Sequence, residues 1–391
     1  SGLTIQNGSG STTGVILCQA DTAPVISGMR FIDNRYGAIN FSNASIQVLR
    51  CEFINNQAPG GAAISGSSYA SFGNDILISG NLFQGNLATA INTGSGQGGA
   101  ISLTGRLRKT ITDNVFRKNR SWAGGAGMYI QESTMSNLHM TNNLFVGNVA
   151  LGSGFECGGT LYVEGSLTTQ DIQIINCTFT DNQSTVLAGG LVFDLDYNNG
   201  VQVTNCILSG NTPVQIYDGN GINPAVTYCN VEGGWPGTGN IDADPMFVAG
   251  DRGAHYLSQV AAGQGSDSPC LDAGSDLATA ICFDNWNGNQ CLDQYSSRTD
   301  DGTDSGTVDM GYHYDVGLPT PAPTPTPQPP RTIYVDDVTD PLEDGTLAHP
   351  FDAIQEAVDL AMDGDTVMVL DGTYTGAGNR YIDTLGKGIT I

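Results

Sequence analysis

Short segments of alternating apolar and polar residues recur along the first 250 residues. Seven of them share an apolar residue at the third position and Asn at the sixth: MRFIDN (29–34), CEFINN (51–56), NLFQGN (81–86), NVFRKN (114–119), NLFVGN (143–148), CTFTDN (177–182) and CILSGN (206–211). The steps between them run from the low twenties to the mid thirties, which is typical of a solenoid with loops of variable length. In a strand, the first and third positions face the same side. We therefore expect both side chains of each segment to point into one core.

Two more strands accompany each of these segments. A glycine pair precedes an alternating apolar run in GGAAI (60–64), GGAI (98–101), GGAGMYI (124–130), GGTLYV (158–163) and GGLVF (189–193). Glycine turns the chain where a Cβ would clash, and a third strand such as SIQVLRC or DIQIINC comes before the Phe. Three short strands per coil predict an all-β fold, a right-handed parallel β-helix, over residues 1–250. A β-sandwich would show shorter and more regular hairpin turns.

The Asn at the sixth position is predicted to lie in a turn. Asn tolerates left-handed backbone geometry, and its amide can hydrogen bond to the same amide one coil away. This predicts a ladder of Asn34, Asn56, Asn86, Asn119, Asn148, Asn182 and Asn211.

These two motifs, FxxN and GGA[ILV], resemble the repeats of polymorphic outer-membrane proteins of the chlamydial type and, more widely, of bacterial right-handed parallel β-helix surface proteins. The resemblance covers residues 1–250 and implies the fold. It also implies an extracellular or cell-surface location of the bacterial type. It does not select an activity, because β-helices serve as lyases, hydrolases, adhesins and structural stalks.

The rest of the chain divides into three segments. Residues 251–316 are acidic and irregular, and strings such as TVDMGYHY resemble the closing segment that covers the final coil in those surface proteins. Residues 317–330 contain LPTPAPTPTPQPP, a polyproline-II linker. In residues 331–391, a strand, an amphipathic helix within 350–365 and further strands resemble the cap that begins such a β-helix. Here it would be the start cap of the next or a neighbouring β-helix.

Both ends of the chain have the pattern of a strand, SGLTIQNG at the start and TLGKGITI at the end. An open coil end exposes unpaired backbone groups and apolar side chains, which favours edge-to-edge association. The cap would cover the open end in a covalent tandem array, in a head-to-tail filament of separate chains, or by folding back on its own chain, which the linker barely allows. We expect self-association through Leu3, Ile5, Phe351, Ile354, Val358, Met362, Ile389 and Ile391.

Charge narrows the range of partners. The formal net charge is −25, with only 14 Lys and Arg, which opposes binding to nucleic acid and to anionic membrane surfaces. No run of about 18 apolar residues predicts a membrane span. The Gly-rich loop TDDGTDSGTVD (299–309) carries Asp300, Asp301, Asp304 and Asp309. These carboxylates are predicted to bind Ca²⁺, with a solvated acidic turn as the alternative.

The 9 cysteines cannot all pair within the chain. Four of them lie in the repeated strands, where a small apolar residue suits the core: Cys51, Cys177, Cys206 and Cys229. Cys282 is expected to close a small loop with Cys291 or Cys270.

The pattern favours a structural function, as a module of an extracellular stalk or a head-to-tail filament, without a catalytic group. An adhesin that binds surface polysaccharide is the first alternative, with Trp122 and Trp235 as contact residues. A polysaccharide lyase or glycoside hydrolase is the second. It would need a groove joining Asp194 and Asp196, which alternate onto one strand face, to a basic residue.

Overall fold

The computed structural model describes residues 2–8, 14–69, 74–90, 96–132, 137–152, 157–165, 171–196, 200–317, 331–340, 343–361, 365–376, 378–380, 382, 384 and 389–391. The chain divides into two compact units, residues 1–320 and 321–391. Met362 and residues 318–330 of the predicted linker lie outside the described residues. No helix of the described chain is long and apolar enough to cross a membrane.

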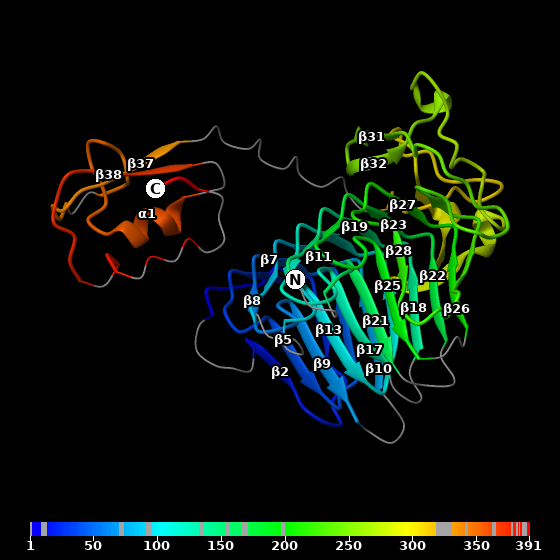
Figure 1. Ribbon diagram of the computed structural model, residues 1–391, viewed down its shortest axis with the longest axis horizontal. Helices are drawn as coiled ribbons and strands as arrows, with labels where there is room; N and C mark the ends of the chain where they lie inside the picture. Colours follow the sequence, from blue (N-terminus) through cyan, green and yellow to red (C-terminus); the bar gives the residue numbers. More distant parts are fainter. Residues whose placement is uncertain are drawn as a thin grey trace. The chain divides into compact units, whose positions relative to one another are not determined.

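The first unit is a right-handed parallel β-helix, which confirms the predicted fold (Figure 1). Its FxxN sheet contains β1 (Thr4–Gln6), β4 (Arg30–Ile32), β7 (Glu52–Ile54), β11 (Leu82–Gln84), β15 (Val115–Arg117), β19 (Leu144–Val146), β23 (Thr178–Thr180), β27 (Ile207–Ser209) and β30 (Asn230–Val231). Its glycine-motif sheet contains β2 (Ile16–Cys18), β5 (Ile39–Ser42), β9 (Ile64–Ser68), β13 (Ile101–Gly105), β17 (Met128–Glu132), β21 (Leu161–Gly165), β25 (Leu191–Leu195) and β28 (Ile216–Asp218).

Two further parallel sheets complete the coils. The third sheet contains β3 (Val25–Ser27), β6 (Ile46–Leu49), β10 (Asn74–Ser79), β14 (Leu107–Thr112), β18 (Asn137–Thr141), β22 (Ile172–Ile175), β26 (Val201–Thr204) and β29 (Ala225–Thr227). A short fourth sheet contains β8 (Gln57–Ala58), β12 (Leu87–Ala88), β16 (Arg120–Ser121), β20 (Val149–Ala150) and β24 (Gln183–Ser184).

A column of stacked phenylalanines runs through the core. Their rings lie face to face, with centroids 4.4–4.9 Å apart and interplanar angles of 3–8°. Each ring is fully buried, and Leu208 continues the column: Phe31, Phe53, Phe83, Phe116, Phe145 and Phe179. The stack fixes the register of successive coils, because each Phe is paired in the sheet with the Phe of the next coil.

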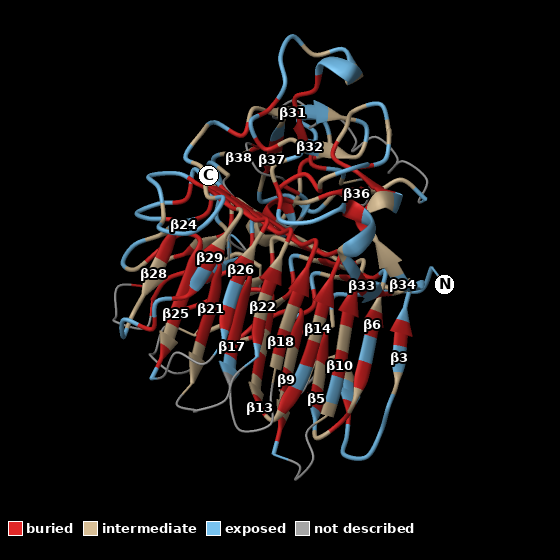
Figure 2. Ribbon diagram, turned by 90° about the vertical axis from the view of Figure 1, so that its right-hand side faces the viewer, coloured by how far each residue is buried: buried red, intermediate tan, exposed pale blue. Residues whose placement is uncertain are grey.

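The closing segment lies along the side of the β-helix, and its Leu257 and Met310 pack with Ile207 and Ile241 of the last coils. Within residues 230–241, Ile241 pairs with Asn230 and Trp235 packs against the core, which closes the final coil. The segment runs along the ends of the third-sheet strands, as Figure 2 shows, and forms hydrogen bonds there with Ser79 and Asn142. These strand ends present polar groups in coil after coil, which gives an irregular segment hydrogen-bond partners along its length.

The elements of this segment are short. Its strands are β31 (Phe247–Gly250), β32 (Gly253–Leu257), β33 (Cys282–Asn285), β34 (Gly288–Cys291), β35 (Tyr295–Ser296) and β36 (Tyr314–Asp315), in antiparallel pairs. Its 3₁₀ turns are η1 (Val260–Ala262), η2 (Ala278–Ala280) and η3 (Leu292–Gln294).

The second unit has a parallel strand–helix–strand order. It contains β37 (Thr332–Val335), α1 (Ile354–Leu360) and β38 (Thr366–Val369). Thr390 forms a further parallel bridge to Thr366, so the strand order runs on toward the C-terminal residues. The helix packs on the two strands around a core that includes Ile333, Ala357 and Val367.

Candidate functional site

The asparagines at the sixth position form a continuous hydrogen-bonded ladder. From Asn34 to Asn182, each Nδ2 donates to the Oδ1 of the next coil, as from Asn86 to Asn119 and from Asn119 to Asn148, both at 2.9 Å. The second Nδ2 hydrogen is donated to a backbone carbonyl one coil back, as from Asn119 to Phe83 at 3.0 Å. Each buried amide is thereby saturated by its neighbours.

The left-handed backbone conformation lies at the fifth position of the segments, one residue before the predicted sixth position. Positive φ angles occur at the fifth position of the segments, for example 53° at Asn55, 66° at Gly85 and 54° at Lys118. The Asn that follows has no positive φ, because its side chain must point inward and the residue before it makes the turn.

A second ladder at the first position of the segments was missed. Asn81 Nδ2 donates to Asn114 Oδ1 at 2.9 Å, and Asn114 Nδ2 donates to Asn143 Oδ1 at 3.0 Å. The thiol of Cys177 continues it by accepting the backbone N–H of Asn143 at 3.4 Å. The signal was present in the recurring Asn or Cys, which sequence reasoning took only for core residues. Burial raises the pKa of the Cys206 thiol well above its usual value.

The two ends of the β-helix differ. At the end opposite the final coil, β1, β2 and β3 are the outermost strands of their sheets among the described residues. Leu3 is 60% exposed there and Ile5 is half-buried against the core, whereas Leu17 and Val25 take the outward-facing register of Asn40 and Gln47. Apolar side chains at a strand edge are a surface suited to a partner. We call this surface the open coil end.

The predicted self-association residues of the second unit differ in how deeply they are buried. Val358 is fully buried in the unit's own core, so it is not available to a partner. The amphipathic helix covers its own two strands, which the sequence pattern alone did not indicate. Phe351, Ile354 and Ile389 are half-buried against that core, and Ile391 is 56% exposed.

The four aspartates of the acidic loop separate into two groups. Arg298 pairs with Asp300 through two hydrogen bonds of 2.9 and 2.6 Å. Arg252 pairs with Asp301 through two hydrogen bonds of 2.9 Å. These arginine hydrogen bonds lower the pKa of Asp300 and of Asp301. Calcium binding by the loop stays a prediction, and its remaining carboxylates are Asp304 and Asp309.

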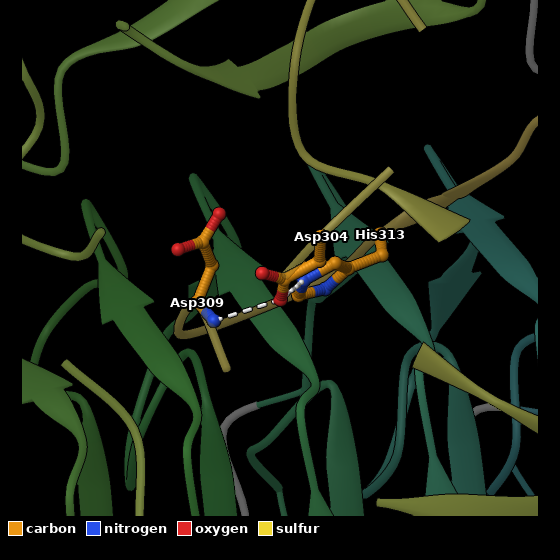
Figure 3. Close-up of side chains that lie close together, drawn as sticks. All are labelled: Asp304, Asp309 and His313. Atoms are coloured by element: carbon orange, nitrogen blue, oxygen red, sulfur yellow. Dashed lines mark hydrogen bonds and ion pairs between the residues drawn. The ribbon is translucent and has the colours of Figure 1, made fainter. Parts of the chain in front are cut away.

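Asp304 and Asp309 lie beside His313 in a buried cluster (Figure 3). His313 Nε2 is 2.9 Å from Asp304 Oδ2, and Nδ1 is 3.0 Å from the carbonyl of Gly311. The Gly311 carbonyl can only accept, so Nδ1 carries a proton, and the Asp304 carboxylate favours a second proton on Nε2. Burial alone would lower the pKa of His313, but the hydrogen bond and charge of Asp304 outweigh it and raise the pKa.

A residue of this cluster, His313, also forms hydrogen bonds that join the closing segment to the coils. The His313 backbone N–H donates to Asn142 Oδ1 at 2.7 Å, and Asn142 Nδ2 donates to the His313 carbonyl at 2.9 Å. Asp309 accepts the backbone N–H of Asp272 at 2.8 Å, and burial, together with the charge of Asp304, raises the pKa of Asp309. The side chains of Asp304, Asp309 and His313 offer ligand atoms within 4.8 Å of one another. A cation there would have to replace the His313 proton.

A second buried carboxylate joins the closing segment to the coils. Asp113 accepts hydrogen bonds from Tyr295 Oη and Asn142 Nδ2, both at 2.6 Å, and from Asn285 Nδ2 at 3.3 Å. Burial raises the pKa of Asp113 to about 7, although the Tyr295 and Asn142 hydrogen bonds lower it. No sequence motif marked this residue, because its partners lie far along the chain.

Asp194 and Asp196 have different surroundings. Asp196 is exposed, whereas Asp194 is half-buried and accepts hydrogen bonds from Tyr162 Oη at 3.0 Å and Asn220 Nδ2 at 3.2 Å. The register neighbour of Asp194 in the preceding coil is Glu164, which accepts a hydrogen bond from Gln131 at 2.7 Å. The carboxylate beside Asp194 is thus on the neighbouring strand. Of the predicted sugar contacts, Trp122 is exposed, whereas Trp235 packs against the core.

The cysteines divide into one disulfide and seven thiols. Cys282 and Cys291 are joined across β33 and β34. Cys270, the alternative partner, is a buried thiol, as are Cys18, Cys51, Cys157, Cys177, Cys206 and Cys229.

Comparison with known proteins supports the fold. The family model for the right handed beta helix region matches residues 1–168. The match and the stacked parallel sheets both support a right-handed parallel β-helix fold. Searches of curated proteins and of solved structures gave no match.

Proposed function

We propose that the chain is a structural module of an extracellular stalk or filament. In this proposal, a unit such as residues 331–391 covers the open coil end of the next β-helix, either in one tandem polypeptide or between separate chains. The asymmetry of the two coil ends carries the proposal, since residues 230–241 close one end, whereas Leu3 is exposed and Ile5 only half-buried at the other. The resemblance to bacterial surface β-helices supports the location outside the cell.

The second unit has the form that such a cover requires. Its strands pair in parallel in the order β37, β38 and Thr390, as strands do between successive coils. Helix α1 covers one side, and Ile391 is exposed beside the last strand. A strand edge that continues this order would suit the outer edge of β1, which has no neighbouring strand among the described residues. A contact between two different surfaces propagates head to tail.

Sedimentation velocity of the full chain tests this function. We expect a concentration-dependent series of oligomers, which Leu3→Asp shortens or abolishes because it places a charge in the apolar contact. Val260→Asp is the matched control, since Val260 in η1 is 55% exposed, compared with 60% for Leu3. A wild-type chain that stays monomeric, or equal effects of both variants, would contradict the proposal.

The second candidate is glycoside hydrolysis on the outer face of the glycine-motif sheet. Glu164 and Asp194 are register partners, and neighbouring strands lie about 4.8 Å apart. Retaining glycosidases hold two carboxyl groups about 5–5.5 Å apart. Release of reducing sugar from neutral polysaccharides that Glu164→Gln abolishes would support this candidate, and no release would exclude it for those substrates.

A further inference from the structure

A partly open cavity of about 320 Å³ lies beside the β33–β34 hairpin. The hairpin turn, η3 and the residues after β36 line it. Pockets that hold small ligands measure about 300–1,000 Å³. The cavity therefore suits a ligand about the size of one ring.

Trp286 forms an aromatic wall of this cavity. The guanidinium of Arg50 lies over the ring, 4.4 Å from its centroid. The edge of the ring meets Gly80, where an added Cβ would come within 2.8 Å of Trp286 Cδ1. With one face and one edge occupied by the coils, the opposite face is the ring surface left for the cavity.

Some polar side chains of the cavity already form hydrogen bonds within the protein, whereas others are exposed to the cavity. Tyr295 and Asn285 also line it, but Tyr295 Oη and Asn285 Nδ2 donate hydrogen bonds to Asp113. Asn287 and Gln294 have exposed side chains that line the cavity and can donate and accept. Asp315 adds a carboxylate, one oxygen of which accepts the backbone N–H of Gly317 at 2.8 Å.

This combination favours a neutral polyhydroxylated ring. The apolar C–H face of such a ring packs on an aromatic face, while amides and a carboxylate bond to its hydroxyl groups. An anionic ligand is disfavoured by Asp315 and by the net charge of −25. The Cys282–Cys291 disulfide closes the hairpin, so the walls are set before a ligand arrives.

We propose that this cavity binds one neutral sugar residue, stacked on Trp286 and hydrogen-bonded by Asn287, Gln294 and Asp315. The proposal is independent of head-to-tail assembly, because the cavity belongs to the closing segment and not to the open coil end.

Saturation-transfer NMR and calorimetry on the full chain test the site, with methyl glycosides of glucose, galactose, mannose and N-acetylglucosamine as probes. Binding of at least one neutral glycoside is expected, with glucuronate weaker. Asn287→Ala and Gln294→Ala should each weaken binding about fivefold to tenfold, because each removes one hydrogen-bonding amide. Both residues are exposed, so neither change is expected to disturb folding.

The control is Asn289→Ala, an exposed residue of the same hairpin that does not line the cavity. It should leave binding unchanged. Trp286→Phe should weaken binding while keeping an aromatic ring against Arg50. Failure of every neutral glycoside to bind, equal binding of glucuronate, or an equal loss in Asn289→Ala would overturn the proposal.

Discussion

Replacing Asn119 by alanine is the sharpest test of what holds the coils together. The fully buried side chain of Asn119 makes four hydrogen bonds. Its Oδ1 accepts from the backbone N–H and the Nδ2 of Asn86, at 3.0 and 2.9 Å. Its Nδ2 donates to the Phe83 carbonyl and to Asn148 Oδ1, at 3.0 and 2.9 Å. Alanine removes all four at once.

The expected loss follows from the groups that are left without partners. Asn148 Oδ1 keeps the backbone N–H of residue 119 as a donor at 3.0 Å. The backbone N–H of Asn86 and one of its amide hydrogens lose their acceptor inside the core. A buried unsatisfied polar group costs about 1–3 kcal/mol, so Asn119→Ala should lower the free energy of unfolding by about 3–5 kcal/mol.

Urea unfolding followed by fluorescence and by hydrogen exchange measures this loss. The midpoint should fall, and the amide hydrogen of Asn86 should exchange faster than in the wild type. Asn289→Ala removes an exposed amide outside the ladder and should change stability by less than about 0.5 kcal/mol. A loss below about 1 kcal/mol in Asn119→Ala would show that the ladder does not stabilise the coils as argued.

Three further predictions address pH, packing and cysteine chemistry. The pKa of Asp113 is raised from 3.8 to about 7, so the stability it contributes is present below pH 3.8 and is lost as pH rises toward 7. The stability of the wild type relative to Asp113→Asn should fall by up to about 4 kcal/mol over that range in urea titrations, and a pH-independent difference would refute this. Gly66→Ala places a Cβ 1.9 Å from Phe41 Cζ and should lower the free energy of unfolding by about 3 kcal/mol, as measured by thermal unfolding. Gly265→Ala, whose Cβ would have nothing within 4 Å, should lower it far less. Similar losses of stability in the two variants would contradict the close packing at Gly66. Iodoacetamide should leave the 7 buried thiols of the native chain unmodified and should label them once the chain is unfolded, as measured by mass spectrometry. It should label Cys282 and Cys291 only after their disulfide is reduced. Rapid labelling of the native thiols would contradict their burial.

The coils could be predicted because their contacts repeat. Phe83 and Phe116 are register partners, and the same spacing that places them in one column places Asn86 beside Asn119. A residue pattern of this kind reports directly on neighbours one coil away. The pattern does not show which residue of a turn has the left-handed backbone conformation. It therefore predicted this conformation at the sixth position, whereas the fifth position has it, for example Lys118.

The contacts of the closing segment could not be predicted because they do not repeat. Asn142 bonds with His313, and Trp286 lies against Arg50, across intervals that no periodicity marks. The separation of the loop's aspartates into two groups could not be predicted for the same reason, because their partners Arg252 and His313 lie outside the loop.

Photo-crosslinking from the open coil end tests the central claim most directly. Leu3 is replaced by benzoylphenylalanine in the full chain, isotopically labelled and unlabelled copies are mixed, and the adducts are mapped by mass spectrometry. Head-to-tail capping predicts an adduct of twice 40.8 kDa that joins residue 3 of one copy to residues 331–391 of another. Adducts confined to a single chain, adducts between two open coil ends, or no adduct would contradict it.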